Sequence, residues 1–199
     1  YKRQLRKKTP GRPYVYPALY RFLYCCGARC GEARHLRCEN VHLSDGYLDI
    51  LQSKGHRDRR LFLSDELISY LIEYDCAIRN CFPKREYFFP GPSGNIISAS
   101  SIPFNFRKIW LAAGLKRDGE IKPRPYDFRH HFACANIARW AKERKDVISM
   151  LPYLMRYMGH SSLEKTYYYV HLIPDYFADY AAATENLESL LPEVEPYEI

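Results

Sequence analysis

The chain has 199 residues and a formal charge of +7, and its charges are unevenly distributed. Residues 1–165 carry all 30 Lys and Arg residues against 16 Asp and Glu, whereas residues 166–199 carry seven acidic residues and no Lys or Arg. The basic part, with a net charge of +14, predicts a polyanionic partner such as nucleic acid or an anionic membrane surface. Because 47% of the residues are hydrophobic, the chain can bury a core, which excludes wholesale disorder.

Simple patterns exclude several further classes of protein. No apolar run approaches the roughly 20 residues that a membrane helix needs, and no apolar signal-peptide stretch follows the basic start of the chain. The seven cysteines show no paired CxxC spacing, so neither a disulfide framework nor a zinc site is indicated. We therefore expect an intracellular protein with reduced cysteines and no membrane partner.

The first 17 residues are basic and contain three prolines, a composition typical of an extended arm or linker. The spacing of apolar residues then predicts a helix over residues 18–26. Gly27 interrupts this pattern, and a second short helix is expected over residues 30–37.

The hydrophobic period changes after these two helices. Residues 47–51 and 60–63 have the pattern of short strands, follow a turn at Asp45-Gly46 and are separated by a polar stretch, so they predict a small antiparallel sheet. An extended piece over residues 87–94 ends in a turn. Further helices are expected over residues 64–79, with Ser64 as N-cap, and near residues 101–114, 127–141, 146–158, 161–168 and 175–190.

The predicted fold class is mainly α with a small antiparallel β-sheet. We expect a basic arm over residues 1–17, one main domain over residues 18–174, and an acidic C-terminal helix and tail over residues 175–199.

Arg29 and Lys54 are the first two candidate functional residues. Gly27 permits a sharp bend before Arg29, and the Glu32 carboxylate, one turn later, could brace its guanidinium through a charge-assisted hydrogen bond. Lys54 lies in the polar stretch between the expected strands. Taken singly, each is more often a solvated surface charge.

Arg129 is a third candidate, because the expected helix places it and Phe132 on one face near an apolar core edge. An arginine is tolerated there chiefly when it holds an anion or a carboxylate. His130 and His131 are adjacent and must point in different directions, so at least one of them is structural or faces solvent.

His160 and the tyrosines at positions 167–169 complete the candidates. His160 follows a glycine that can end one helix, and a serine at position 161 or 162 can cap the next, which leaves backbone amides that favour an anion. Three consecutive side chains on a helix diverge by about 100° each, so only one of the tyrosines can face a given site. Spacing alone does not choose it.

Taken in order, five segments resemble the catalytic domain of the tyrosine recombinase (phage integrase) family. They are GARCGE with Arg29, the turn with Lys54, the RHH block with Arg129, MGHSS with His160, and TYYYVH. The resemblance covers roughly residues 15–180 and is nearest to integrases and transposases of bacterial mobile elements. It implies the tyrosine recombinase catalytic-domain fold for the main domain.

The family's Thr-x-x-Tyr-x-His motif maps onto Thr166, Tyr169 and His171. The resemblance therefore implies that Tyr169 is the nucleophile and leaves Tyr167 and Tyr168 as packing or surface residues.

The other matches imply further roles. Arg29 and Arg129 match the two phosphate-clamping arginines, Lys54 matches the lysine between sheet strands, and His160 matches the histidine before the nucleophile. Glu32 and His171 are expected to support the site.

Tyr126 departs from the family pattern, because many members have histidine three residues before the second arginine. A phenol can donate or accept a hydrogen bond, but its ordinary pKa near 10 makes it a poorer proton acceptor than imidazole at neutral pH. Tyr126 is kept as a site residue without an assigned role.

The resemblance implies a site-specific DNA recombinase or integrase. Tyr169 would attack a phosphodiester to give a 3′-phosphotyrosine and a free 5′-hydroxyl, and a 5′-hydroxyl of the partner strand would reverse the attack. Lys54 would protonate the leaving 5′-oxygen, and no metal or nucleotide cofactor is required. The implied partners are double-stranded DNA and three further copies in a homotetramer assembled on it, in the bacterial cytoplasm.

Two alternatives to strand exchange remain open. One is a type IB topoisomerase, which has similar chemistry but relaxes DNA without exchanging partners, and the other is a non-catalytic DNA-binding module.

The apolar spacing of the expected C-terminal helix suits donation to a neighbouring protomer, as in recombinases, or packing on its own domain. Family members usually carry a DNA-clamping domain before the catalytic one, so we expect this chain to lack that part.

Overall fold

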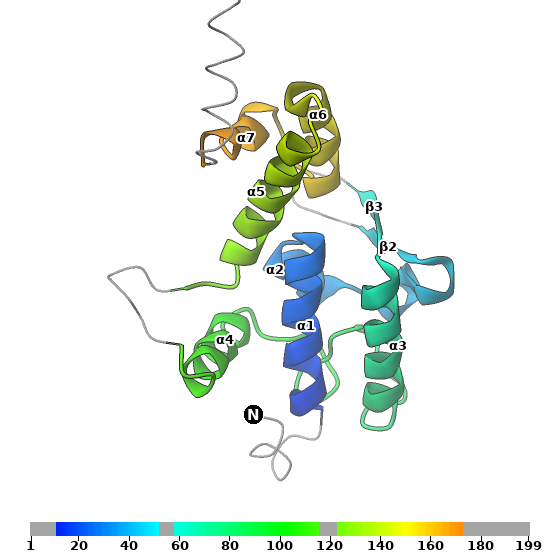
Figure 1. The fold of residues 1–199 in the computed structure, drawn as a ribbon. Helices are drawn as coiled ribbons and strands as arrows, with labels where there is room; N and C mark the ends of the chain where they lie inside the picture. The colour runs from blue at the N-terminus through cyan, green and yellow to red at the C-terminus, as the bar shows by residue number, and fades with distance from the viewer. Residues whose placement is uncertain (1–10, 52–57, 116–122, 173–199) are drawn as a thin grey trace, which may run out of the picture.

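The structure is a computed structural model that describes residues 11–51, 58–115 and 123–172 (Figure 1). Over these residues it is mainly helical with a small antiparallel sheet, so the predicted fold class is confirmed. The elements are α1 (Arg12–Cys26), α2 (Cys30–His35), β1 (Val41–His42), β2 (Tyr47–Ile50), β3 (Arg59–Phe62), α3 (Asp65–Arg79), α4 (Ser101–Ala112), α5 (Asp127–Lys142), α6 (Val147–Met158) and α7 (Glu164–Tyr167). Short 3-10 helices lie at Cys38–Asn40, Leu43–Asp45 and Val170–Leu172.

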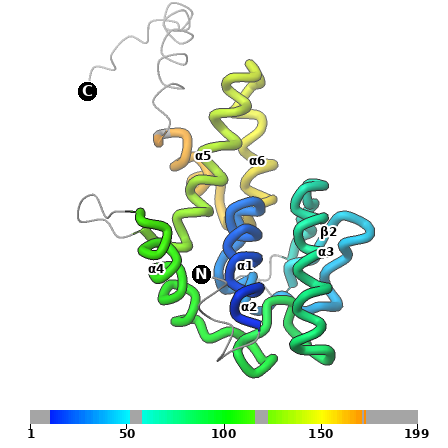
Figure 2. The backbone as a smooth tube through the Cα atoms, turned by 60° about the horizontal axis from the view of Figure 1, so that its bottom comes forward, coloured from blue at the N-terminus to red at the C-terminus, as the bar shows by residue number. Residues whose placement is uncertain are grey.

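Helix α1 contributes to the larger of two hydrophobic cores. Its residues Val15, Leu19, Phe22 and Leu23 follow helical spacing and are all fully buried. Helix α3 and α5 both contact α1, and α4 lies near its N-terminal half (Figures 1 and 2). The hydroxyl of Tyr20 donates to a backbone carbonyl at the start of α4, so this buried phenol is satisfied.

The sheet has the strand order β1-β2-β3, and both pairs are antiparallel. Leu48 of β2 lies opposite Leu61 of β3, and both side chains are fully buried against the larger core. Their neighbours Asp49 and Arg60 also face each other and form an ion pair on the outer side of the sheet. This alternation follows from the two-residue period of a strand.

The smaller core is formed by α5, α6 and the residues that directly follow α7, and it includes Ile137, Leu151 and Val170. The carboxylate of Asp146 caps α6 by accepting from the backbone amides of the first turn. Tyr157 packs against both cores and stacks on Phe132 with 5.4 Å between the ring centroids, so it joins them near the end of α6.

The prediction of an extended arm up to residue 17 is wrong over its last six residues, because α1 begins at Arg12. Pro13 fits the first turn, where its missing amide hydrogen has no helical partner to lose. Pro17 lies inside the helix and removes one backbone hydrogen bond. The buried side chains of Val15 and Tyr16 outweigh that loss, and composition alone does not reveal their burial. Residues 1–10 lie outside the described part of the chain.

The last predicted helices differ in extent from those found. The helix expected over residues 161–168 is reduced to the four residues of α7, and the helix expected over residues 175–190 lies outside the described residues. No helix in the described part of the chain is long and apolar enough to cross a membrane.

Candidate functional site

Arg29 lies on the bend that the sequence predicts between α1 and α2. Gly27 ends α1 with a φ of +58°, which is a left-handed conformation that favours glycine. A Cβ atom at Gly27 would also lie 2.6 Å from the ring of Phe132 on α5. Glycine is therefore required both for the bend and for the close approach of α5. Arg29 is the N-cap residue of α2, and its side chain is 27% exposed.

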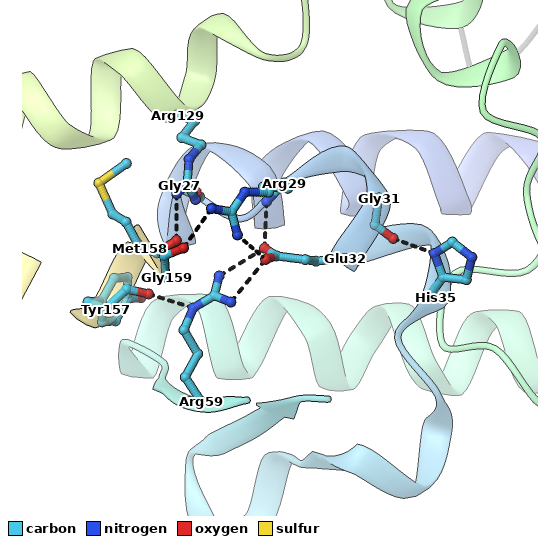
Figure 3. Close-up of polar contacts among 10 residues, drawn as sticks. All are labelled: Gly27, Arg29, Gly31, Glu32, His35, Arg59, Arg129, Tyr157, Met158 and Gly159. Atoms are coloured by element: carbon cyan, nitrogen blue, oxygen red, sulfur yellow. Dashed lines mark hydrogen bonds and ion pairs between the residues drawn. The ribbon is translucent and has the colours of Figure 1, made fainter. Parts of the chain in front are cut away.

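Glu32 binds Arg29 as the sequence predicts. Its carboxylate accepts from the backbone amide of Arg29 at 2.8 Å and from the Arg29 guanidinium at 2.7 Å. Burial by itself would raise the pKa of Glu32, but hydrogen bonds and charge from Arg59, followed by bonds from Arg29, hold that pKa below its usual value. Glu32 is therefore ionised at neutral pH and braces two guanidiniums (Figure 3).

Arg59 is a buried member of this network that sequence reasoning missed. Its two terminal nitrogens donate to the two oxygens of Glu32 at 2.9 and 2.8 Å, and its side chain is only 7% exposed. The strand pattern could have predicted its inward position, because Arg59 and Arg60 are adjacent on a strand and must point to opposite faces. Arg60 binds Asp49 on the outer face, which leaves Arg59 facing inward toward Glu32.

Three consecutive carbonyl oxygens at the C-terminal end of α6 each accept a hydrogen bond from a different arginine (Figure 3). The pairs are Tyr157 with Arg59 at 2.6 Å, Met158 with Arg129, and Gly159 with Arg29 at 2.7 Å. The last carbonyls of a helix have no helical partner and carry the negative end of its dipole, so this end suits cations. The end of α6 thereby brings together arginines from three segments.

Gly159 makes this convergence sterically possible. It ends α6 with a φ of +65°, and a Cβ atom there would lie 3.1 Å from a terminal nitrogen of Arg59 and 3.4 Å from one of Arg29. A side chain at this position would press on the guanidinium of Arg59.

Arg129 is the most deeply buried of the three arginines, with 1% exposure. One terminal nitrogen donates to the Gly27 carbonyl at 2.7 Å, while its Nε is buried without a hydrogen-bond partner among the described residues. Burial first, and then the charge of Arg29, lowers the pKa of Arg129 to about 10, so it stays charged at neutral pH. Three guanidiniums against the single carboxylate of Glu32 leave an excess of two positive charges, which favours an anion.

His160 follows the three carbonyls directly and is 7% exposed. Its Nδ1 lies 2.8 Å from the hydroxyl of Thr166. Burial first, and then the charges of Arg129 and Arg29, lowers the pKa of His160 to about 4. The imidazole is therefore neutral at neutral pH and can present one N–H to an anion.

Tyr169 is the tyrosine of positions 167–169 that the fold turns inward. It is 3% exposed, whereas Tyr167 and Tyr168 are 37% and 55% exposed. Its ring stacks on that of His160 with centroids 6.0 Å apart. The pKa of Tyr169 is raised, mainly by burial and then by the neighbouring phenol of Tyr126, while the charge of Arg129 acts in the opposite direction. The hydroxyl is therefore protonated at neutral pH.

Tyr126 and the two adjacent histidines lie at the start of α5. Tyr126 is 46% exposed, and its ring meets that of His130 edge-on at 5.0 Å, while His130 in turn contacts the ring of Tyr169 at 5.5 Å. His131 points elsewhere, is exposed and stacks on Tyr24 at 5.0 Å, so the expectation that one of the pair is structural or faces solvent is confirmed.

The structure thus brings Arg29, Glu32, Arg129, His160 and Tyr169 together and adds Arg59. Lys54 and the side chain of His171 lie outside what the structure describes. Among the described residues, no group of three or more His, Cys, Asp or Glu side chains is placed to hold a metal ion.

The chain is similar to several known proteins. The model of the phage integrase family matches residues 7–175. A putative integrase/recombinase, y4rE, of Sinorhizobium fredii is 33% identical over 81% of this chain and 52% of its own length. The crystal structure of XerA recombinase gives a TM-score of 0.68 at 22% identity, covering 85% of this chain and 56% of that one.

A second solved structure, XerH site-specific recombinase bound to its palindromic difH substrate, gives a TM-score of 0.67 at 24% identity and covers 89% of this chain and 48% of that one. At these identities the two likenesses concern the fold, which is that of tyrosine recombinase catalytic domains. The chain spans about half the length of the curated relatives it matches.

Proposed function

The chain belongs to the phage integrase family, and we propose that it is a site-specific DNA recombinase, which cuts DNA strands and joins them to new partner strands through a covalent bond between Tyr169 and a DNA phosphate. The observation that carries the proposal is the convergence of three guanidiniums and a neutral imidazole beside a buried tyrosine. An excess of two positive charges suits the phosphodiester of double-stranded DNA.

Tyr169 is proposed as the nucleophile. Its oxygen attacks phosphorus, and the bond to the 5′-oxygen breaks, which leaves a 3′-phosphotyrosine and a free 5′-hydroxyl. The bond energy is retained in the phosphotyrosine, so a 5′-hydroxyl of another strand can reverse the step.

Arg29 and Arg129 are proposed to hold the non-bridging oxygens, on which negative charge grows as phosphorus becomes pentacoordinate. His160 is neutral and can donate a hydrogen bond to one of these oxygens without carrying charge. Both arginines are already fixed by backbone carbonyls and Glu32, so little reorganisation is needed during the reaction.

Lys54 is proposed as the general acid for the leaving 5′-oxygen. It belongs to the segment between β2 and β3, and β3 begins with Arg59, which binds Glu32. This connection ties one end of the lysine-bearing segment to the arginine cluster.

The assembly is proposed to contain several copies of the chain on one DNA, as the family resemblance implies for a homotetramer. Residues 166–199 carry seven acidic residues and no Lys or Arg, which suits a basic surface of a neighbouring copy better than DNA. The same proposal divides the chain into a basic arm that ends before α1, a catalytic domain and an acidic tail.

A covalent-trapping experiment tests the proposal. Nicked duplex oligonucleotides from the ends of bacterial mobile elements would be incubated with the protein, so that the short 5′-hydroxyl strand diffuses away after cleavage and the adduct accumulates. We expect an adduct with the unchanged protein and with the matched controls Tyr167→Phe and Tyr168→Phe, and none with Tyr169→Phe.

Three outcomes would contradict the proposal in different ways. An adduct with Tyr169→Phe would reject the nucleophile. DNA binding with a steep salt dependence but no adduct would indicate a binding module. Relaxation of supercoiled plasmid, with no product that joins two sites, would indicate a topoisomerase.

A further inference from the structure

We propose that His130 takes the proton of the Tyr169 hydroxyl as Tyr169 attacks DNA, and so supplies the imidazole that this chain lacks at position 126. The inference rests on the proposed function. It concerns a residue that sequence reasoning left without a role, because its neighbour His131 looked equivalent.

The position of His130 follows from the geometry of α5. It lies four residues after Tyr126, and residues at this spacing occupy the same face of a helix. The two rings are in contact, with their centroids 5.0 Å apart. The His130 imidazole therefore lies beside the Tyr126 ring, on the side of α5 that contacts Tyr169.

Contact with Tyr169 is the second observation. The His130 ring lies 5.5 Å from the Tyr169 ring, centroid to centroid, at an angle of 57°. Among the described residues, no hydrogen bond to the Tyr169 hydroxyl is formed, so this contact is between rings only. Hydrogen bonds of a general base commonly tighten only when the substrate is present.

The Tyr169 hydroxyl needs a proton acceptor because burial raises its pKa. The other groups that act electrostatically on this phenol are the phenols of Tyr126 and Tyr168, the Cys134 thiol and the Arg129 guanidinium. None of these is a good acceptor, since phenols and thiols are protonated at neutral pH and a guanidinium has no lone pair to offer. The two imidazoles whose rings contact Tyr169, those of His130 and His160, are more suitable bases.

His160 also contacts Tyr169, but its surroundings suit a different task. The pKa of His160 is lowered to about 4, first by burial and then by Arg129 and Arg29, which makes this imidazole a weak base. Its Nδ1 is already engaged with Thr166. His160 thus donates a hydrogen bond to the phosphate, and His130 accepts the proton of Tyr169.

The Tyr169 oxygen forms its bond to phosphorus while its proton passes to a neutral nitrogen of His130. The bond from phosphorus to the 5′-oxygen breaks, and that oxygen takes a proton from Lys54. In the reverse reaction the imidazolium of His130 returns its proton to the departing phenolate.

The test measures the rate of covalent adduct formation on a nicked duplex that the unchanged protein cleaves. We expect His130→Ala to slow the adduct by about 100-fold, within the range for loss of a general base, with unchanged DNA affinity and unchanged melting temperature. His131→Ala is the matched control, since its side chain stacks on Tyr24 away from the nucleophile, and it should react at the original rate.

Two rescue experiments separate proton transfer from packing. Added imidazole should accelerate His130→Ala, and the double variant Tyr126→His with His130→Ala should regain most of the lost rate, because each restores an imidazole near Tyr169. A His130→Ala protein that reacts at the original rate would overturn the inference, as would a slow variant that neither treatment accelerates or an equal loss in His131→Ala. These outcomes leave the proposed function intact, whereas it fails together with the inference if the unchanged protein forms no adduct.

Discussion

The two hydrophobic cores contribute differently to the candidate site. Among the described residues the larger core has 23 buried members and the smaller has nine. Arg29 and Glu32 lie on a bend anchored to the larger core, whereas Tyr169 is itself a member of the smaller one. Arg29 and Glu32 therefore rest on an extensive core, while Arg129 on α5 and Tyr169 belong to the side of the smaller core.

Polar side chains lie at the junction of the two cores, and their hydrogen bonds fix how the cores are placed relative to each other. Arg29 and Arg59 come from the side of the larger core and bind carbonyls at the end of α6, which belongs to the smaller one (Figure 3). Hydrophobic contacts tolerate small shifts between two bodies, but hydrogen bonds to fixed carbonyls have narrow distance and angle limits. These hydrogen bonds thus fix the positions of Arg29 and Arg59 relative to His160 and Tyr169.

The largest effect on this junction is expected from Arg59→Gln, with Arg60→Gln as the matched control. Loss of Arg59 leaves Glu32 buried with one guanidinium instead of two and frees the Tyr157 carbonyl. The free energy of unfolding should fall by about 3 kcal/mol, near the lower limit for breaking a buried ion pair. Covalent adduct formation should fall as well.

Urea unfolding of the two variants measures the difference. Arg60 forms an exposed pair with Asp49, so its replacement should change stability little. Equal losses in both variants would show that the inward position of Arg59 has no special importance.

A smaller effect is expected from Gly159→Ala, compared with Gly31→Ala. An alanine at position 159 would have to adopt the unfavourable φ of +65°, and its Cβ atom would lie 3.1 Å from a terminal nitrogen of Arg59. The expected loss is about 1–2 kcal/mol from the left-handed conformation alone. Gly31 lies on α2, where an added Cβ would meet nothing within 4 Å, so alanine should be neutral or stabilising.

Thermal melting and the adduct assay together sharpen the comparison. Gly159→Ala should lower both the melting temperature and the rate, whereas Gly31→Ala should lower neither. A Gly159→Ala protein with full activity would show that the guanidiniums tolerate displacement.

A third effect, which appears only below neutral pH, is expected from the pH dependence contributed by His160. Its pKa is lowered from 6.5 to about 4 in the fold, so below pH 6.5 the unfolded chain binds a proton that the folded chain does not. The contribution of His160 to stability is therefore complete above pH 6.5 and decreases as the pH falls toward 4.

The measurement is urea unfolding between pH 4 and 7 for the unchanged protein and for His160→Gln. The variant should show a weaker loss of stability across this range. An identical pH dependence in both would contradict the depressed pKa of His160.

Much of the fold could be predicted from local patterns. The bend at Gly27, the small sheet and the N-cap of α3 at Ser64 were all expected and are found. These features depend on short-range geometry, such as the left-handed preference of glycine and the two-residue period of strands. The start of α1 was missed because the burial of Val15 and Tyr16 depends on distant parts of the chain.

The candidate site was predictable where residues interact within one turn. Glu32 was expected to bind Arg29, three residues away, and it does. Arg59 escaped notice because its partners, Glu32 and Tyr157, are 27 and 98 residues away in the chain. His130 and His131 could not be told apart for the same reason, since their environments are set by Tyr169 and by Tyr24.

The sequence by itself determined the fold class, the order of the elements, the family resemblance and the types of residue available for phosphate chemistry. Only the tertiary structure decided which of two adjacent arginines joins the site and which of two adjacent histidines faces Tyr169. The physical reason is that local periodicity orients a side chain relative to its own element. The partner it meets depends on how distant elements pack, and here that packing is set at the C-terminal end of α6.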